Sequence, residues 1–179
     1  MDKTSRMRDY LTDGHISVRR YHIDDASALY EAVHESIAEL TRWGFYHPGF
    51  NIQDAERDVI SRIKDWNEGK SYKYLIEALP GPVLIGNCGV SELKLDKNQA
   101  ALGWWVRTSK TGRGIATAAA RLVARAAFED LQLCVLNIYA KVDNYPSRRV
   151  AEKIGATLAQ IKTEEDRSRT AVYQLKPNF

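Results

Sequence analysis

Hydrophobic residues recur along the first third of this chain in two periods, and the change of period separates one strand from two helices. Alternation predicts a strand over His15–Arg20, with Ile16 and Val18 on one face. Helical spacing begins after Asp24 and again after Asn51, and either polar residue can cap a helix. The two apolar stripes are Leu29, Val33, Ile37 and Leu40, then Ile52, Ala55, Val59, Ile63 and Trp66.

The middle of the chain has the pattern of consecutive strands. Tyr72–Ala78, Val83–Leu95 and Ala100–Val106 are apolar runs. They are separated by Pro80-Gly81-Pro82 and by Asp96-Lys97-Asn98, whose composition is typical of turns. We therefore expect three neighbouring strands joined by short turns.

The last third returns to alternating helices and strands after the glycine-containing loop 109–114. The predicted elements are a helix over Ile115–Glu129, a strand over Cys134–Val142, a helix from Pro146 to about Gly155, and strands over Thr157–Ile161 and Ala171–Leu175. The whole order predicts an α/β fold with a mixed sheet. We expect residues 1–13 to form a polar N-terminal segment and residues 14–179 to form one domain.

Composition and charge exclude several classes of function. With 179 residues, 44% hydrophobic and 27% charged, the chain suits one soluble domain, and its net charge of +3 is too small and too dispersed to indicate nucleic-acid binding. No apolar run reaches the roughly 20 residues that span a bilayer. Cys88 and Cys134 both lie in apolar runs, which predicts buried free thiols and a cytoplasmic protein. The histidines have no spacing typical of a metal site, and none is expected.

The loop from Thr111 to Thr117 is the strongest chemical signal. Gly112 and Gly114 allow successive backbone N–H groups to converge on an anion, and the start of the following helix adds donors and a partial positive charge. The loop lacks the Lys-Ser/Thr pair of a Walker A motif and the third glycine of a dinucleotide fingerprint. Spacing alone leaves open a diphosphate site or a plain strand–helix turn.

A second segment, Asn144-Tyr-Pro-Ser147-Arg-Arg-Val-Ala-Glu-Lys-Ile-Gly155, gives the loop a context. Together with Gly112-Arg-Gly-Ile-Ala-Thr117 it resembles the GNAT superfamily of N-acetyltransferases, in particular the RimJ/RimL branch that acetylates ribosomal-protein N-termini. Three more segments match in order: His34–Trp43, Leu84–Gly89 and Leu102–Val106. The resemblance implies a single-domain GNAT-like fold, in which helices flank a mixed, mostly antiparallel sheet.

The resemblance also implies acetyl-coenzyme A as co-substrate, without a metal. The loop would hold the pyrophosphate, strand Trp104–Arg107 and Asn144 would hold the pantetheine arm, and Arg148 or Arg149 would meet the outer phosphate. The residues expected to bind the cofactor are Trp105, Val106, Arg107, Thr111, Gly112, Arg113, Gly114, Ile115, Ala116, Thr117, Asn144, Ser147 and Arg149. Thr111 departs from the family, which usually has Gln or Arg there, so weaker cofactor binding is expected.

The catalytic groups are incompletely matched. Ser147 would protonate the leaving thiolate. Many relatives carry a Glu that receives the amine's proton just before the Leu-Gly-aromatic strand, and this chain has Ala101 there. Glu92, on the adjacent strand, is our predicted replacement base, although an exposed strand carboxylate is the alternative interpretation. His47 is a further candidate if its loop folds inward.

The acceptor is the least constrained part of the prediction. The loop from Trp43 to Phe50 resembles the segment that frames the acceptor site, so Trp43, Phe45, Tyr46 and Trp104 are expected to bind substrate. The branch implies a protein N-terminal α-amine. A small amine and a non-catalytic coenzyme A-binding module stay open, as does a homodimer. A buried acidic pocket would favour the small amine, and an open groove would favour a peptide.

Overall fold

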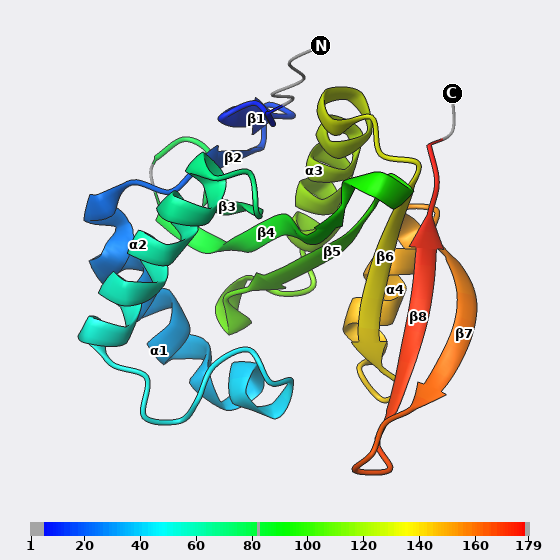
Figure 1. The fold of residues 1–179 in the computed structure, drawn as a ribbon. Helices are drawn as coiled ribbons and strands as arrows, with labels where there is room; N and C mark the ends of the chain where they lie inside the picture. Colours follow the sequence, from blue (N-terminus) through cyan, green and yellow to red (C-terminus); the bar gives the residue numbers. More distant parts are fainter. Residues whose placement is uncertain (1–5, 82, 178–179) are drawn as a thin grey trace.

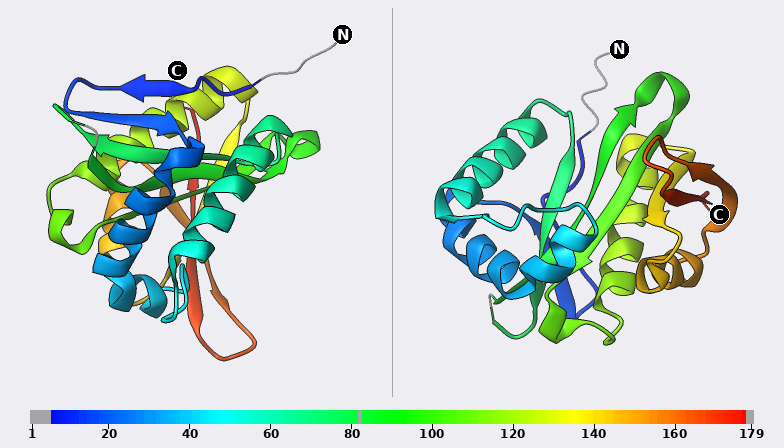
Figure 2. Two further views of the ribbon diagram at one scale, coloured as in Figure 1. Left: turned by 90° about the vertical axis from the view of Figure 1, so that its left-hand side faces the viewer. Right: turned by 90° about the horizontal axis from the view of Figure 1, so that it is seen from below.

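One eight-stranded sheet with helices on both faces forms the protein (Figures 1 and 2). The computed structural model describes residues 6–81 and 83–177. Its strands are β1 (Tyr10–Thr12), β2 (Ile16–Arg20), β3 (Tyr72–Ala78), β4 (Val83–Lys94), β5 (Gln99–Val106), β6 (Val135–Lys141), β7 (Thr157–Thr163) and β8 (Arg169–Leu175). Its α-helices are α1 (Ala26–Arg42), α2 (Ile52–Asn67), α3 (Ile115–Leu131) and α4 (Tyr145–Lys153). The spatial order is β1-β2-β3-β4-β5-β6-β8-β7, and only β5 and β6 pair in parallel.

Local signals explain most of these boundaries. Asn51 caps α2 by accepting the Asp54 N–H, while the Asp54 carboxylate accepts the Asn51 N–H, and this reciprocal pair fixes the start of the helix. The expected order of strands and helices is confirmed, and β3 matches its predicted ends. The predicted turn at Pro80-Gly81-Pro82 includes Pro82, which lies outside the described residues.

The N-terminal segment differs from its prediction. Tyr10–Thr12 pairs with β2, the Met7 side chain is buried, and Arg8 forms an ion pair with Asp130 at the end of α3. Residues 7–12 therefore pack against the rest of the fold, while the domain boundary at residue 14 stays a prediction. A three-residue strand is too short to show alternation, which explains why the sequence did not reveal it.

The two cysteines also differ from each other. Cys88 is buried in β4, and burial raises the pKa of its thiol to about 12. Cys134, just before β6, is exposed, which corrects the prediction that both thiols are buried.

The sheet separates two hydrophobic cores. The larger core lies between the sheet and the Ala-rich helix α3, and the smaller one lies under α1 and α2 on the opposite face, as the view from below shows (Figure 2). Trp104 packs in the first core and its neighbour Trp105 packs in the second, because successive strand residues point to opposite faces.

The sheet opens between β5 and β6. Their parallel pairing covers only Gln99–Ala101 against Val135–Asn137. Beyond this point β5 stays paired with β4 and β6 stays paired with β8, so the two strands diverge (Figure 1). The opening lies between α1 on one side and α4 on the other, and it positions the site described next.

Candidate active site

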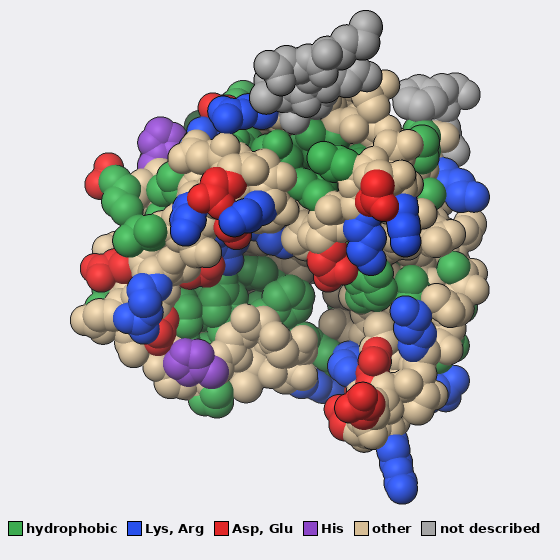
Figure 3. Space-filling model, in the orientation of Figure 1, with side chains coloured by type: hydrophobic (Ala, Val, Ile, Leu, Met, Phe, Trp, Pro, Cys, Tyr) green, Lys and Arg blue, Asp and Glu red, His purple; other side chains and the backbone are tan. Residues whose placement is uncertain are grey.

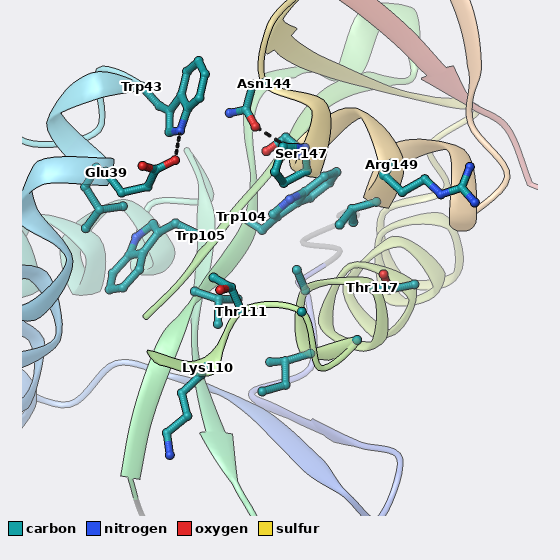
Figure 4. Close-up of a pocket in the computed structure, with 18 of the residues that line it drawn as sticks. Glu39, Trp43, Trp104, Trp105, Lys110, Thr111, Thr117, Asn144, Ser147 and Arg149 are labelled. Carbon is teal, nitrogen blue, oxygen red and sulfur yellow. Dashed lines mark hydrogen bonds between the residues drawn. The ribbon is translucent and has the colours of Figure 1, made fainter. Parts of the chain in front are cut away.

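A cleft of about 300 Å³ lies at the opening between β5 and β6. Its lining comes from α1, β5, the loop before α3, and α4 (Figure 4). The space-filling view shows the molecule hollowed between the half that carries α1 and α2 and the half that carries β6 to β8 (Figure 3). Segments far apart in the sequence therefore meet around one cavity.

Backbone amides of the glycine loop have no partner among the described residues, and most residues of the loop line this cleft. No hydrogen bond from the N–H groups of residues 112–117 is found within the described part of the chain, and α3 has no side-chain cap at its start. Gly112 and Gly114 have φ angles of 74° and 79°, in the left-handed region that favours glycine. A Cβ built on either glycine would meet nothing within 4 Å. The loop therefore presents an open cradle of donors at a helix N-terminus, which suits an anion.

Basic side chains surround this cradle. Lys110, Arg149 and Lys153 line the cleft, and Figure 4 shows Lys110 and Arg149 extending outward from it. Arg148 does not line it, because its guanidinium donates to the Val142 carbonyl and to the Tyr173 hydroxyl. This arrangement favours Arg149 over Arg148 for contact with an outer phosphate. Lys110 and Lys153 were missed in the sequence, although Lys153 lies one helical turn after Arg149.

Arg113 is not brought to the cleft. Its side chain is exposed, and the residue is absent from the lining, whereas its neighbours Gly112 and Gly114 are present. The predicted contact of Arg113 with the cofactor stays a prediction, and the basic residues that line the cleft are Lys110, Arg149 and Lys153.

Strand β5 exposes backbone groups to the opening. The Arg107 N–H donates to Ile85 in β4 at 2.8 Å. Because consecutive N–H groups of a strand point to opposite edges, those of Trp104 and Val106 face the gap left by β6. Arg107 itself is withdrawn: its side chain donates to the Leu84 carbonyl and to Glu35. The side chain therefore has a structural role, and the predicted contact of this residue with the cofactor stays a prediction.

The start of α4 supplies the polar wall opposite β5. Asn144 is buried and caps the helix by accepting the Ser147 N–H at 3.1 Å, as the dashed line in Figure 4 shows. Ser147 lines both the main cleft and a small cavity of about 80 Å³ beside Tyr139. Its hydroxyl has no hydrogen bond to another described residue. The cap therefore fixes the backbone of Ser147 and leaves the hydroxyl available.

Two substitutions at Asn144 separate its two roles. Asn144→Ala is expected to lower the free energy of unfolding by about 1 kcal/mol, because the helix loses its cap. Asn144→Asp keeps a capping oxygen but removes the amide donor, so it should retain stability while weakening cofactor binding. Chemical denaturation and calorimetric titration of coenzyme A measure the two effects. Equal cofactor affinity for Asn144→Asp and the native chain would exclude the amide as a ligand.

The aromatic loop after α1 forms the other wall. Trp43 and Phe45 line the main cleft together with Trp104. Phe45 and Trp104 also line a second cavity of about 650 Å³, to which Tyr46 contributes on the face covered by α1 and α2. The third, small cavity shares Phe45 and Trp104 with both. The four residues predicted to bind substrate thus lie around adjoining spaces.

The predicted bases lie elsewhere. Glu92 is exposed, adopts a left-handed φ of 51° at a bulge of β4, and lines none of the three cavities. Its charge nevertheless reaches Tyr139, whose pKa is raised first by burial and then by Glu92. His47 does line the second cavity, but its side chain is exposed and lies 3.4 Å from Asp54. Neither Glu92 nor His47 lines the small cavity that contains Ser147, and the role of either as base stays a prediction.

Carboxylates near the second cavity are already engaged. Asp58 receives two hydrogen bonds from Arg62, and Asp54 is bound by Arg57 and by the cap of α2.

Over the described ranges no group of three or more metal-binding side chains occurs. No described helix is long and apolar enough to cross a membrane.

Comparison with known proteins agrees with this geometry. Residues 15–157 match the family model described as an acetyltransferase (GNAT) domain. The chain is 32% identical over 161 residues to a Bacillus subtilis protein named "Putative ribosomal N-acetyltransferase YdaF", covering 89% of this chain and 84% of that protein.

Solved structures share the fold at low sequence identity. RimL, a ribosomal L7/L12 α-N-protein acetyltransferase solved with coenzyme A, is 18% identical with a TM-score of 0.84, covering 93% of this chain and 96% of that one. The microcin C7 self-immunity acetyltransferase MccE, solved with acetyl-coenzyme A and AMP, is 19% identical with a TM-score of 0.83, covering 93% and 94%.

Proposed function

Because the chain belongs to the GNAT family of N-acetyltransferases, we propose that it transfers the acetyl group of acetyl-coenzyme A to the N-terminal α-amine of a protein. The observation that carries the cofactor assignment is the row of unpartnered amides over residues 112–117, which opens on the same cleft as Asn144 and Ser147. A diphosphate satisfies such a cradle, and Lys110, Arg149 and Lys153 complement its charge.

The cleft extends from the glycine loop along β5 to Ser147, and this path supports the remaining roles that we propose. The Trp104 and Val106 amides, which lack strand partners at the open edge of β5, would hold the pantetheine arm. The Ser147 hydroxyl, which lines the same cleft, would protonate the departing thiolate. One of the β5 amides is placed to stabilise the tetrahedral oxyanion. Alignment of amine and thioester supplies most of the acceleration.

The second cavity favours a peptide over a polycationic small amine. A polyamine or aminoglycoside carries several positive charges and needs free carboxylates, but Asp54 and Asp58 are bound by arginines and Glu39 accepts the Trp43 indole N–H. The cavity is large, at about 650 Å³, and aromatic side chains line it. These features suit an extended chain end. The relative named as a ribosomal N-acetyltransferase supports the same class of acceptor.

A thiol-release assay with acetyl-coenzyme A tests this proposal. Peptides with a free α-amine are compared with the same peptides blocked at that amine, and with a polyamine, an aminoglycoside and free amino acids. We expect thiol release only with free peptide N-termini. Turnover confined to small amines would overturn the acceptor class. Coenzyme A binding without turnover on any acceptor would instead indicate a cofactor-binding module.

A further inference from the structure

Lys73 lies on β3, the third strand of the sheet, and it lines the second cavity. Its neighbours Tyr72 and Tyr74 pack in the core under α3, so Lys73 points to the opposite face, toward α2. The next residue in register on β4 is Gly89, and the residue after that, on β5, is Gly103. A row across three strands therefore begins with one long side chain and continues with two residues that have none.

The lysine side chain runs across this row. A Cβ built on Gly89 would lie 3.0 Å from Lys73 Cδ, which places the aliphatic stem over Gly89. A Cβ built on Gly103 would meet nothing within 4 Å. Lys73 and Gly103 line the second cavity together, and Gly103 also lines the small cavity that contains Ser147. The aliphatic stem of Lys73 thus extends toward Gly103, where the second cavity and the small cavity adjoin.

The charged end of Lys73 has no fixed partner. Its Nζ forms no hydrogen bond or ion pair with any other residue that the structure describes. The nearby acid on α2, Asp58, is bound at both oxygens by Arg62, whose own buried charge faces the same cavity. Burial lowers the pKa of the Lys73 ammonium, and Arg62 lowers it further, while Cys88, Asp58 and Glu92 act in the opposite direction. His47 and Asp54 line the same cavity but are paired with each other.

We propose that Lys73 accepts the proton that the acceptor amine loses during acetyl transfer. This inference rests on the proposed function. The amine nitrogen forms a bond to the thioester carbonyl carbon, one N–H proton passes to the neutral Lys73 amine, and the C–S bond breaks as Ser147 protonates the thiolate. Exchange with water then removes the proton from Lys73 and restores the one on Ser147. Lys73 in this way replaces a carboxylate missing at Ala101, which lies on the same face of β5, two residues from Gly103.

The residue type fits the task. An ordinary lysine, with a pKa near 10.4, is almost entirely protonated at neutral pH and cannot accept a proton. A lysine in a cavity, beside a buried arginine and without its own acid, has a larger neutral fraction, which is the form a general base needs. The alternation of side chains along β3 directs Lys73 to this face, and the two glycines leave space for its side chain. The relation between these residues depends on the strand register, which the sequence alone does not show.

Two variants test the proposal. Lys73→Met keeps the stem without the amine, and Lys73→Arg keeps the positive charge but cannot deprotonate at accessible pH. Both are expected to lower kcat about 100-fold at neutral pH, with coenzyme A affinity unchanged. The loss should shrink as pH rises, because the acceptor then deprotonates in water. Peptide turnover across pH and coenzyme A titration measure these effects on folded protein.

A second readout does not depend on activity. NMR titration of isotope-labelled lysine side chains should show one signal, absent from Lys73→Arg, with a pKa below the others. Full activity of Lys73→Arg would overturn the proposal, because it would show that only the charge matters. So would an unchanged pH profile for Lys73→Met. The native chain keeps the outcomes distinct: if it acetylates no amine, the proposed function fails, whereas an active native chain with active variants refutes only the role of Lys73.

Discussion

Replacement of Ser147 by alanine is expected to lower kcat by 100-fold to about 1000-fold, the usual contribution of a proton donor. The affinity for coenzyme A should change little. The structural reason is that the Ser147 backbone is held by the Asn144 cap, while its hydroxyl lines both the main cleft and the small cavity. The substitution therefore removes a proton donor without moving α4. Single-turnover kinetics with a peptide acceptor and calorimetry with coenzyme A separate the two quantities.

A matched control for this variant is Ser61→Ala, the same change on the exposed side of α2. Ser61 lines none of the cavities, so its variant should behave as the native chain. If Ser147→Ala weakens coenzyme A binding in proportion to the loss of turnover, the hydroxyl is a binding group and not the proton donor.

Gly112→Asp is expected to weaken coenzyme A binding by several hundredfold. A carboxylate would stand in the cradle formed by the loop amides, facing the two charges of a diphosphate. Repulsion at about 4 Å costs roughly 1 to 4 kcal/mol per charge pair between water and a protein surface, which accounts for an effect of this size. Titration of coenzyme A at two ionic strengths measures it, because the electrostatic share should fall as salt rises.

Gly14→Asp is the control for backbone strain. Gly14 has a φ of 89°, and a Cβ built there meets nothing within 4 Å, so the same substitution imposes a similar left-handed penalty far from the cleft. We expect it to lower stability slightly and to leave coenzyme A affinity unchanged. A large loss of affinity in both variants would attribute the effect to strain in the fold, and equal affinity of Gly112→Asp and the native chain would reject the cradle.

The sequence predicted the parts of the fold that local interactions determine. The cap at Asn51, the ends of β3 and the turn into α3 each depend on a few neighbouring residues, and all agree with the structure. The glycine loop and the segment around Ser147 were recognised for the same reason: each is a continuous stretch with its own chemistry.

The register between strands and the contacts between residues distant in the chain could not be predicted from the sequence. Strand adjacency to Ala101 predicts Glu92 as a base, whereas the exposure of Glu92 at a bulge of β4 depends on a register that the sequence does not show. Lys73 was missed because its relation to Gly103 passes through a third strand. The ion pair of the Arg107 side chain with Glu35, 72 residues earlier, likewise could not be predicted from the sequence.

The divergence of β5 and β6 affects the stability of the folded chain. The two parts of the sheet are bridged by three residue pairs, and the remaining edge amides must find partners in water or in a guest molecule. A bound molecule that contacts both β5 and β6 would hold the two parts of the sheet together. Folding and occupancy are then coupled, and a hundredfold excess of ligand over its Kd adds about 2.7 kcal/mol to the free energy of unfolding. We therefore expect the thermal stability of the protein to rise with the concentration of the ligand that occupies this gap.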